Sequence, residues 1–321
     1  MKKAIIYGLG QRYQVFNSWL RKEVGNDYEI IAASDRQRPA VSIDDLFIEP
    51  QKIVTIDFDI IIITSDRFFT EISEEIQSKY GITDNKIMSM EHLIEDVYNR
   101  KFHTDLFVGK YGVEVGGPSD LFTGNIYDVC RNCDGINYNE NTVWWEKDND
   151  RYFYEDKELG TVIISDATDL SAIKDDKYDF CISSNNLEHI ANPIKALKEQ
   201  YRIVKKGGLL LVIVPMKDKC FDHNREFTTF EHLLEDYTND ISERDLTHLD
   251  EILQKHDISM DLGCVGGMDE FKKRSLKNYE NRCLHHHVFS KEVLESIFKY
   301  LNVNIIDCGE LDWIYYIIGS K

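Results

Sequence analysis

The stretch Val113–Asp120, with the sequence VEVGGPSD, decides how the rest of the chain is interpreted. Its first three residues predict a short strand that carries an acidic residue, and Gly116-Gly117 predict a tight turn that opens a helix. Rossmann-like folds use a strand, a glycine turn and a helix to bring the backbone close to a nucleoside. Because Gly-Gly-Pro also forms ordinary loops, the interpretation depends on the segments that follow.

Three later segments complete an ordered series. Val162–Leu170 predicts a strand that ends in Asp-Ala, and Tyr178–Ile190 predicts a strand followed by a helix. Lys205–Pro215 adds a Lys-Lys-Gly-Gly turn and a further apolar strand. In this order the segments resemble the class I S-adenosylmethionine-dependent methyltransferases, clearly over residues 108–215 and more loosely over 285–321.

Apolar spacing predicts two domains of the α/β class. Residues 1–100 are expected to form a small Rossmann-like domain with a parallel sheet, and residues 101–321 the methyltransferase domain. The resemblance places an insertion on the substrate side at about 216–284. Strands are expected at 4–8, 28–34, 57–65 and near Ile87, then at 113–115, 133–137, 162–165, 179–183, 209–214, 303–307 and 313–318, with helices at 11–24, at 68–80 and from Lys291.

The composition is that of an acidic globular protein. The 321 residues include 38 lysines and arginines against 57 aspartates and glutamates, a net charge of −19. This charge argues against nucleic-acid partners, whose binding depends on neutralising phosphates, and against docking on anionic membranes. Seven cysteines without regular pairing indicate a reducing compartment, so we expect a cytoplasmic protein.

The apolar runs are all short. None approaches the ~20 residues that cross a bilayer, so we expect no membrane insertion. Met1–Gly8 has too short an apolar segment for a signal peptide and predicts a first strand.

The resemblance implies S-adenosylmethionine as the cofactor and assigns residues to hold it. Glu114 is expected near the amino-acid end of the cofactor, and Gly116 and Gly117 are expected to let the chain pass beneath it. Pro118 and Ser119 stand where the family usually has a third glycine, and a proline suits the first turn of a helix.

Further residues are assigned to the other parts of the cofactor. Either Asp134 or Asn137 is expected on the ribose, although Asp134 before glycine also suits a turn. Asp166 matches the adenine ligand with Ala167 beside it, and turn capping is its alternative role. Asn185 is expected to face the methyl donor.

The insertion supplies candidates for acceptor chemistry. Methyl transfer needs alignment of donor and acceptor and often the removal of one proton, for which histidine is suited. We therefore expect catalytic roles for Asp222, His223 and His232. His189, by contrast, resembles a structural residue of the family and is expected to pack or cap near the cofactor.

Metal dependence is weighed against the same histidines. On an extended segment His285 and His287 share one face, and Asp222 could complete a site. No spacing matches a strong metal motif, so we expect no metal. The pair Cys130-x-x-Cys133 lacks a second pair and predicts buried thiols rather than zinc ligands.

Two further features have competing interpretations. Gly8-Leu9-Gly10 with Asp35 suggests a dinucleotide site, but Tyr13 replaces the third glycine, which favours a structural domain. The cluster Lys272, Lys273, Arg274, Lys277 and Arg282 could meet phosphates, but it is expected to be a solvated helix face.

The expected activity is O-methylation of a sugar or nucleotide-activated sugar, with a small-molecule acceptor as partner. The runs Glu231–Asp236 and His285–Phe289 are similar to two-part methyltransferases of bacterial capsule and lipopolysaccharide biosynthesis. One alternative is a NAD-dependent sugar-nucleotide oxidoreductase or epimerase using residues 1–100, against which the lack of a Tyr-x-x-x-Lys pair counts. A non-catalytic S-adenosylmethionine-binding module is the other, and a homo-oligomer is left open.

Overall fold

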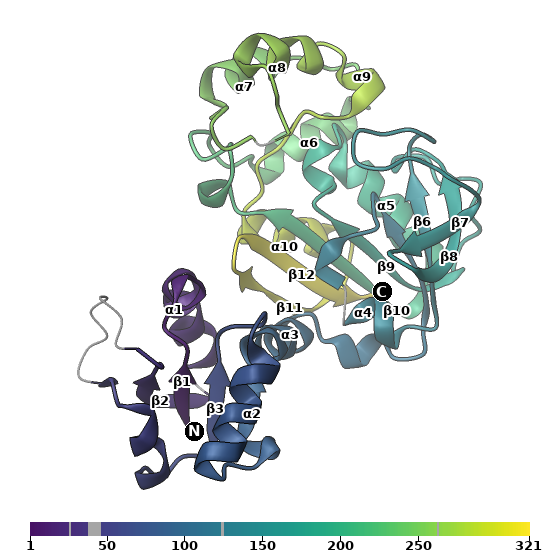
Figure 1. The fold of residues 1–321 in the computed structure, drawn as a ribbon. Helices are drawn as coiled ribbons and strands as arrows, with labels where there is room; N and C mark the ends of the chain where they lie inside the picture. Colours follow the sequence, from purple (N-terminus) through teal and green to yellow (C-terminus); the bar gives the residue numbers. More distant parts are fainter. Residues whose placement is uncertain (26, 38–45, 123–124, 262) are drawn as a thin grey trace. The chain divides into compact units, whose positions relative to one another are not determined.

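The computed structural model describes all residues of the chain except 26, 38–45, 123–124 and 262 (Figure 1). The chain divides into two compact units, Met1–Arg100 and Lys101–Lys321. None of the described helices is long and apolar enough to cross a membrane.

The unit of residues 1–100 is built on a four-stranded parallel sheet with the order β2-β1-β3-β4. Its strands are β1 Lys2–Tyr7, β2 Tyr28–Ser34, β3 Ile60–Ile63 and β4 Ile87–Ser89, and its helices are α1 Gln11–Val24, α2 Phe69–Tyr80 and α3 Met90–Lys101. Isoleucines of β1 and β3 pack with those of α2 in one core, which is why β3 is apolar throughout. The strand predicted at 57–65 is thus confined to its four central residues.

Residues 101–321 form an eight-stranded sheet with the order β11-β12-β10-β9-β5-β6-β8-β7. The strands are β5 Tyr111–Val115, β6 Asn132–Asn137, β7 Arg151–Tyr154, β8 Lys157–Ile164, β9 Tyr178–Ser184, β10 Val204–Pro215, β11 Asn304–Leu311 and β12 Ile314–Ser320. The central five strands are parallel, and β12 is antiparallel to both of its neighbours. From β5 the chain proceeds outward to β8 and then returns to β9 on the other side, so the strand order reverses between β5 and β9. The predicted α/β Rossmann-like class is confirmed.

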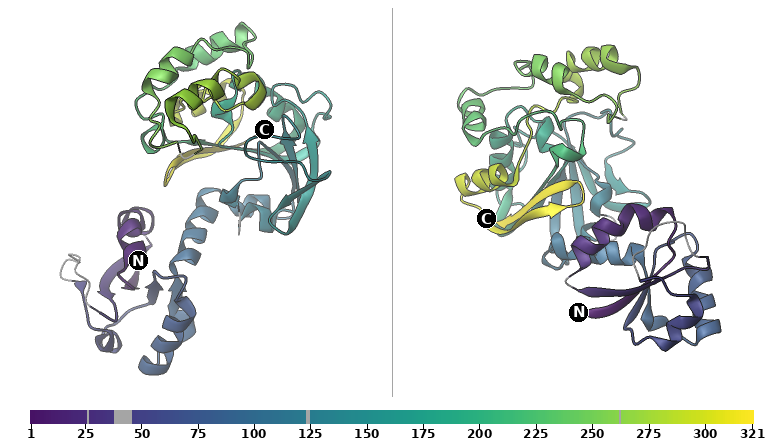
Figure 2. Two further views of the ribbon diagram at one scale, coloured as in Figure 1. Left: turned by 45° about the horizontal axis from the view of Figure 1, so that its top comes forward. Right: turned by 90° about the vertical axis from the view of Figure 1, so that its left-hand side faces the viewer.

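The helices of this unit serve two purposes. They are α4 Ile126–Val129, α5 Pro193–Ile203, α6 Phe230–Thr238, α7 Leu249–Lys255, α8 Gly267–Ser275, α9 Asn278–Asn281 and α10 Lys291–Tyr300. Apolar residues of α5, α6 and α10 join the main core against the sheet. In contrast, α7, α8 and α9 group at one end of the unit (Figures 1 and 2), where α7 and α8 share a smaller apolar cluster with Leu284. Short 3-10 turns lie at Pro50–Thr55, Asp84–Lys86, Thr104–Phe107, Asp120–Phe122, Leu187–His189 and Lys217–Lys219.

One local prediction is wrong, and one strand was not predicted. No helix opens directly after Gly116-Gly117: Pro118 lies in an irregular segment that leads to the 3-10 turn at Asp120–Phe122. Strand β7 was not predicted, because it is a four-residue edge strand with one fully buried side chain, Tyr152, and so lacks an apolar run.

A close contact between neighbouring strands β5 and β9 gives a stability prediction. A Cβ atom on Gly112 would overlap the ring of the fully buried Phe180. We therefore expect Gly112→Ala to lower the free energy of unfolding by about 1–3 kcal/mol, the usual range for overpacking. Urea unfolding followed by fluorescence measures the change. Gly263→Ala is the control, because a Cβ there makes only ordinary contacts; equal losses in both variants would contradict the packing argument.

Candidate active site

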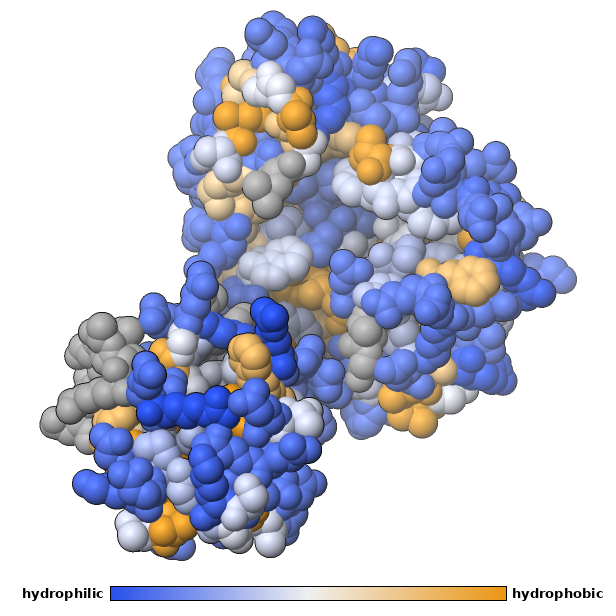
Figure 3. Space-filling view, viewed as in Figure 1, coloured by the Kyte–Doolittle hydropathy of each residue, from blue (hydrophilic) through white to orange (hydrophobic). Residues whose placement is uncertain are grey.

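A cavity of about 420 Å³ opens at the carboxyl ends of the parallel strands of residues 101–321. Residues at or after the ends of β5, β6, β8, β9 and β10 line it, so it lies where the strand order reverses. Open α/β sheets bind ligands at this position. Figure 3 shows the surface of this unit hollowed, with apolar and neutral residues inside.

The structure brings most of the predicted cofactor residues to this cavity. Those that line it are Gly116, Pro118, Ser119, Asn137, Asp166, Ala167 and Asn185. The remaining three, Glu114, Gly117 and Asp134, support the walls from behind, as described below.

The glycine turn forms the floor of the cavity. Gly116 has a φ of +85°, and a Cβ there would lie 2.5 Å from Oδ1 of Asn186. The carbonyl of Gly117 accepts a hydrogen bond of 3.2 Å from Nδ2 of Asn137, which ties the turn to the end of β6. Only glycine therefore fits at 116, and the backbone itself is left facing the cavity.

Glu114 lies fully buried beneath this turn rather than in the cavity. Its Oε2 accepts hydrogen bonds from the hydroxyls of Tyr127 and Tyr152, and the Tyr127 hydroxyl in turn accepts from the backbone N–H of Ser119. Burial raises the pKa of Glu114 to about 7, and the two tyrosine hydrogen bonds oppose this rise. Glu114 thus holds the turn from below.

The two candidates for the ribose position separate clearly. Asp134 is buried within the sheet, where its carboxylate accepts hydrogen bonds from Tyr111, Tyr178 and Thr161. Asn137, at the end of the same strand, lines the cavity. The geometry therefore favours Asn137.

Asp166 caps a turn and also lines the cavity. Its Oδ1 accepts hydrogen bonds from the backbone N–H and the hydroxyl of Thr168, which is a capped turn. Its Oδ2 lies 3.0 Å from Nη2 of Arg282, and both residues line the cavity.

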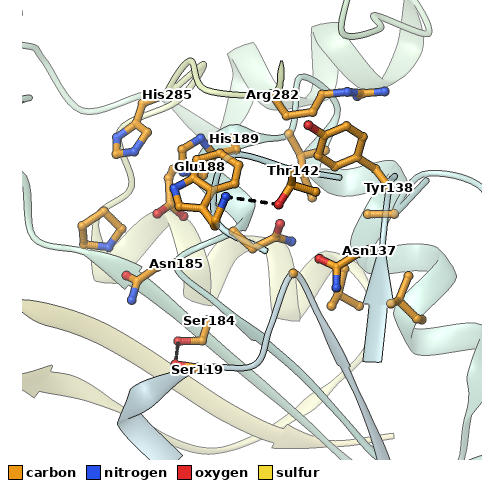
Figure 4. A pocket seen from close by; sticks show the side chains of 18 of the residues that line it. Ser119, Asn137, Tyr138, Thr142, Ser184, Asn185, Glu188, His189, Arg282 and His285 are labelled. Carbon is orange, nitrogen blue, oxygen red and sulfur yellow. Dashed lines mark hydrogen bonds between the residues drawn. The ribbon is translucent and has the colours of Figure 1, made fainter. Parts of the chain in front are cut away.

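The end of β9 adds polar groups opposite the glycine turn. Asn185 has a φ of +44°, which is uncommon for a residue other than glycine, and its buried Oδ1 has no hydrogen-bond partner among the described residues. Oγ of Ser184 lies 3.1 Å from Oγ of Ser119 and connects β9 to the turn (Figure 4). An unpartnered amide oxygen beside exposed backbone is suited to an ammonium group, as on the amino-acid end of S-adenosylmethionine.

A second polar group lies at another part of the cavity. Figure 4 shows Glu188, His189 and His285 together, away from Ser119 and Ser184. Oδ2 of Asp222 lies 2.5 Å from Nδ1 of His285, and the guanidinium of Arg225 donates to the same carboxylate and to the His285 carbonyl. Burial opposes the charged form of His285, but the Asp222 carboxylate outweighs it and raises the pKa of the imidazole.

The predicted catalytic residues lie elsewhere. His223 does not line the cavity and pairs with Asp257 at 3.0 Å. His232 lies beside His248, also away from the cavity. Asp222 reaches the cavity only through His285, which it orients. These residues are predicted because they lie in the insertion, but the folded insertion pairs His223 and His232 with residues of its own, and it pairs Asp222 with His285.

Other lining residues were not predicted. Trp144 is 58% exposed and its ring centroid lies 4.9 Å from that of His189. Trp313 is 38% exposed at the rim, and Tyr138 packs beneath the Arg282 guanidinium. Two adjacent tryptophans in the polar run 139–150 were the available signal. Arg282 does not lie on a solvated helix face as predicted. Its guanidinium pairs with the carboxylates of Asp166 and Glu243.

The glycine turn of residues 1–100 borders a separate cavity of about 370 Å³. Here Oδ2 of Asp35 accepts a hydrogen bond of 2.6 Å from the backbone N–H of Leu9. The acid that would hold a ribose in a dinucleotide site is thus engaged by the turn itself.

Comparisons with known proteins bear on both units. Residues 113–212 match the methyltransferase domain family, and residues 1–88 match the family described as C2185-like, N-terminal. None of the curated proteins matches the chain. Among solved structures, a SAM-dependent methyltransferase from Aquifex aeolicus is similar with 15% identity over 71% of this chain and 95% of its own, at a TM-score of 0.37.

Two further methyltransferase structures are similar to the chain at comparable identity and TM-score. A methyltransferase from Mesorhizobium loti has 11% identity over 67% of this chain and 92% of its own, at a TM-score of 0.40. One from Methanosarcina mazei has 14% identity over 66% and 92%, at a TM-score of 0.38.

The family match covers the strands and turns that build the cavity, from β5 to β10. The chain is an S-adenosylmethionine-dependent methyltransferase, and S-adenosylmethionine is its cofactor.

The burial of Glu114 gives a pH prediction. Because its folded pKa is raised, its contribution to stability is present below the unfolded value of 4.5 and is lost as the pH rises through about 7. The full difference corresponds to about 3 kcal/mol. We expect Glu114→Gln to remove this pH dependence, so that the variant gains stability over the wild type between pH 5 and pH 8.

Urea unfolding at several pH values, followed by tryptophan fluorescence, measures this gain, since three of the four tryptophans lie in residues 101–321. Parallel stability curves for wild type and Glu114→Gln would contradict a raised pKa at Glu114.

Proposed function

We propose that this methyltransferase transfers a methyl group to a hydroxyl of a sugar, in the biosynthesis of a surface polysaccharide in the cytoplasm. One observation carries the proposal. A single cavity contains both the glycine turn, which is suited to a nucleoside, and the polar group of Glu188, His189 and His285. The first part suits the methyl donor and the second suits a hydroxyl acceptor that must lose its proton.

The chain's own residues divide the work in this proposal. The backbone at Gly116 and the side chain of Asn137 line the donor part, and the Asn185 amide oxygen receives an ammonium group. When bound, S-adenosylmethionine supplies a methyl group on a sulfonium, so that transfer joins the acceptor oxygen to the methyl carbon and leaves the broken carbon–sulfur pair on sulfur. Glu188, His189 and His285 provide the surroundings in which the acceptor hydroxyl loses its proton.

Aromatic side chains support a sugar as the acceptor. Trp144 and Trp313 present exposed rings at the cavity, and the flat apolar face of a sugar ring packs on such surfaces. The resemblance of the runs Glu231–Asp236 and His285–Phe289 to two-part methyltransferases of capsule and lipopolysaccharide biosynthesis is the sequence argument for the same class. Arg282 is already paired with two carboxylates, so a nucleotide-activated sugar has less support than a sugar without a diphosphate.

A ligand-binding measurement distinguishes this proposal from an oxidoreductase. We expect calorimetry to detect S-adenosylhomocysteine binding and no NAD binding, because Asp35 is engaged by the Leu9 backbone. Gly116→Ala should abolish the S-adenosylhomocysteine signal, since the new Cβ meets Asn186. NAD binding without S-adenosylhomocysteine binding would overturn the proposal.

A positioning role for Asp222 gives an activity prediction. With an acceptor found by mass-spectrometric screening of sugars, nucleotide sugars and glycans, we expect Asp222→Asn to lower kcat by about 10–100-fold. The affinity for S-adenosylhomocysteine should not change, because Asp222 does not line the cavity.

His223→Ala is the matched control, since His223 pairs with Asp257 outside the cavity and should leave kcat unchanged. An equal loss in His223→Ala would contradict this assignment. Binding of S-adenosylhomocysteine with no methyl transfer to any acceptor would favour the non-catalytic module instead.

A further inference from the structure

We propose that Glu188, His189 and His285 bind one divalent transition-metal cation inside the cavity (Figure 4). One ligand atom from each residue lies within 4.8 Å of the others. Two imidazoles and one carboxylate on one side of a cavity leave further coordination positions open to a substrate. This inference rests on the proposed function, because it assigns the cation to the acceptor part of the same site.

Two of the three ligands carry buried atoms without a hydrogen bond. Glu188 is 2% exposed, and its Oε2 has no partner among the described residues. The same is true of Nδ1 of His189. Leaving a buried carboxylate oxygen and a buried ring nitrogen unpaired is costly, and native proteins rarely do so without a reason. A cation between them would satisfy both atoms.

The third ligand is oriented in the way that metal-binding histidines are. Nδ1 of His285 donates to Asp222, so Nε2 carries the lone pair and is the atom free to bind a cation. Metal-ligating histidines usually donate their other ring N–H to a carboxylate or a backbone carbonyl. His189 follows the same pattern, because its imidazole hydrogen bonds with the backbone of Leu284 while its Nδ1 is unpaired.

The two segments that supply the ligands are fixed to each other. The backbone N–H of His286 donates to the carbonyl of Glu188 at 2.8 Å. Arg225 is 3% exposed and donates to the carbonyls of His285 and His286. The ligand atoms are therefore held together by the fold before any cation arrives, which is what a specific site requires.

The ligand set indicates both the metal and the acceptor. Imidazole nitrogens favour Mn²⁺, Fe²⁺, Co²⁺ or Zn²⁺ over Mg²⁺ and Ca²⁺, which prefer oxygen alone. A bound cation would coordinate the acceptor oxygen and lower the pKa of its hydroxyl, whose proton then passes to water. Acceptors with neighbouring hydroxyls, which chelate a cation, are the substrate class that this site selects.

A second cluster of histidines provides the comparison. His232, Asp236 and His287 also lie within 4.8 Å of one another, and Asp236 Oδ2 and His287 Nδ1 lack hydrogen bonds. In this cluster, however, Nε2 of His232 is already 3.0 Å from Nε2 of His248, and none of the three residues lines the cavity. It therefore lies outside the cavity in which an acceptor is proposed to bind.

The test is metal binding by the full chain after treatment with a chelator. We expect calorimetry and elemental analysis to find one Mn²⁺ or Zn²⁺ per chain, with an affinity that falls at least ~10-fold in Glu188→Gln and in His189→Gln. His232→Gln should bind the cation as the wild type does. Circular dichroism shows whether each variant folds, and His189, which is less buried than Glu188, serves if Glu188→Gln does not.

Two results of the metal-binding experiment would contradict the proposed site. Absence of cation binding, or binding that is lost only in His232→Gln, would overturn it. Calorimetry with S-adenosylhomocysteine separates this failure from that of the proposed function. A chain that binds S-adenosylhomocysteine but no cation keeps the methyltransferase proposal and loses only the metal.

Discussion

The site depends on how closely the chain can approach a ligand at the end of β5. A side chain at Gly116 would meet Asn186, and one at Gly117 would meet the carboxylate of Glu114. The turn therefore packs closely against the end of β9 on one side. On the other side it packs against the buried Glu114, which is hydrogen-bonded to Tyr127 and Tyr152. Because this close packing occurs where the strand order reverses, it places bare backbone in the cavity that the sheet creates.

The two parts of the cavity are lined by different kinds of side chain. Asn137, Asp166 and Asn185 come from the ends of three strands and provide neutral or paired polar groups. The polar group at the other part comes from two segments. Glu188 and His189 follow β9, and His285 follows the insertion. The insertion itself supplies Asp222 and Arg225, which hold His285 in place.

The sequence predicts the donor part well because its signals are local. Gly116, Ala167 and Asn185, which the resemblance assigns to the cofactor, lie within a few residues of strand ends, and all three line the cavity. The sequence could not show which of Asp134 and Asn137 reaches the cavity. The two residues are three positions apart, and the predicted end of the strand was not precise enough to place one in the middle and the other at the end. The acceptor part fails for a different reason. Asp222 and His285 are 63 residues apart, and no local pattern announces that they pair.

We propose that the cavity at the ends of β5, β6, β8 and β9 holds the methyl donor. A crystal structure of the full chain with S-adenosylhomocysteine tests it most directly. We expect the amino-acid end of the ligand beside Gly116 and Asn185, the ribose at Asn137 and the adenine beside Asp166 and Ala167. A ligand found in the cavity of residues 1–100, or outside the strand ends of residues 101–321, would contradict it.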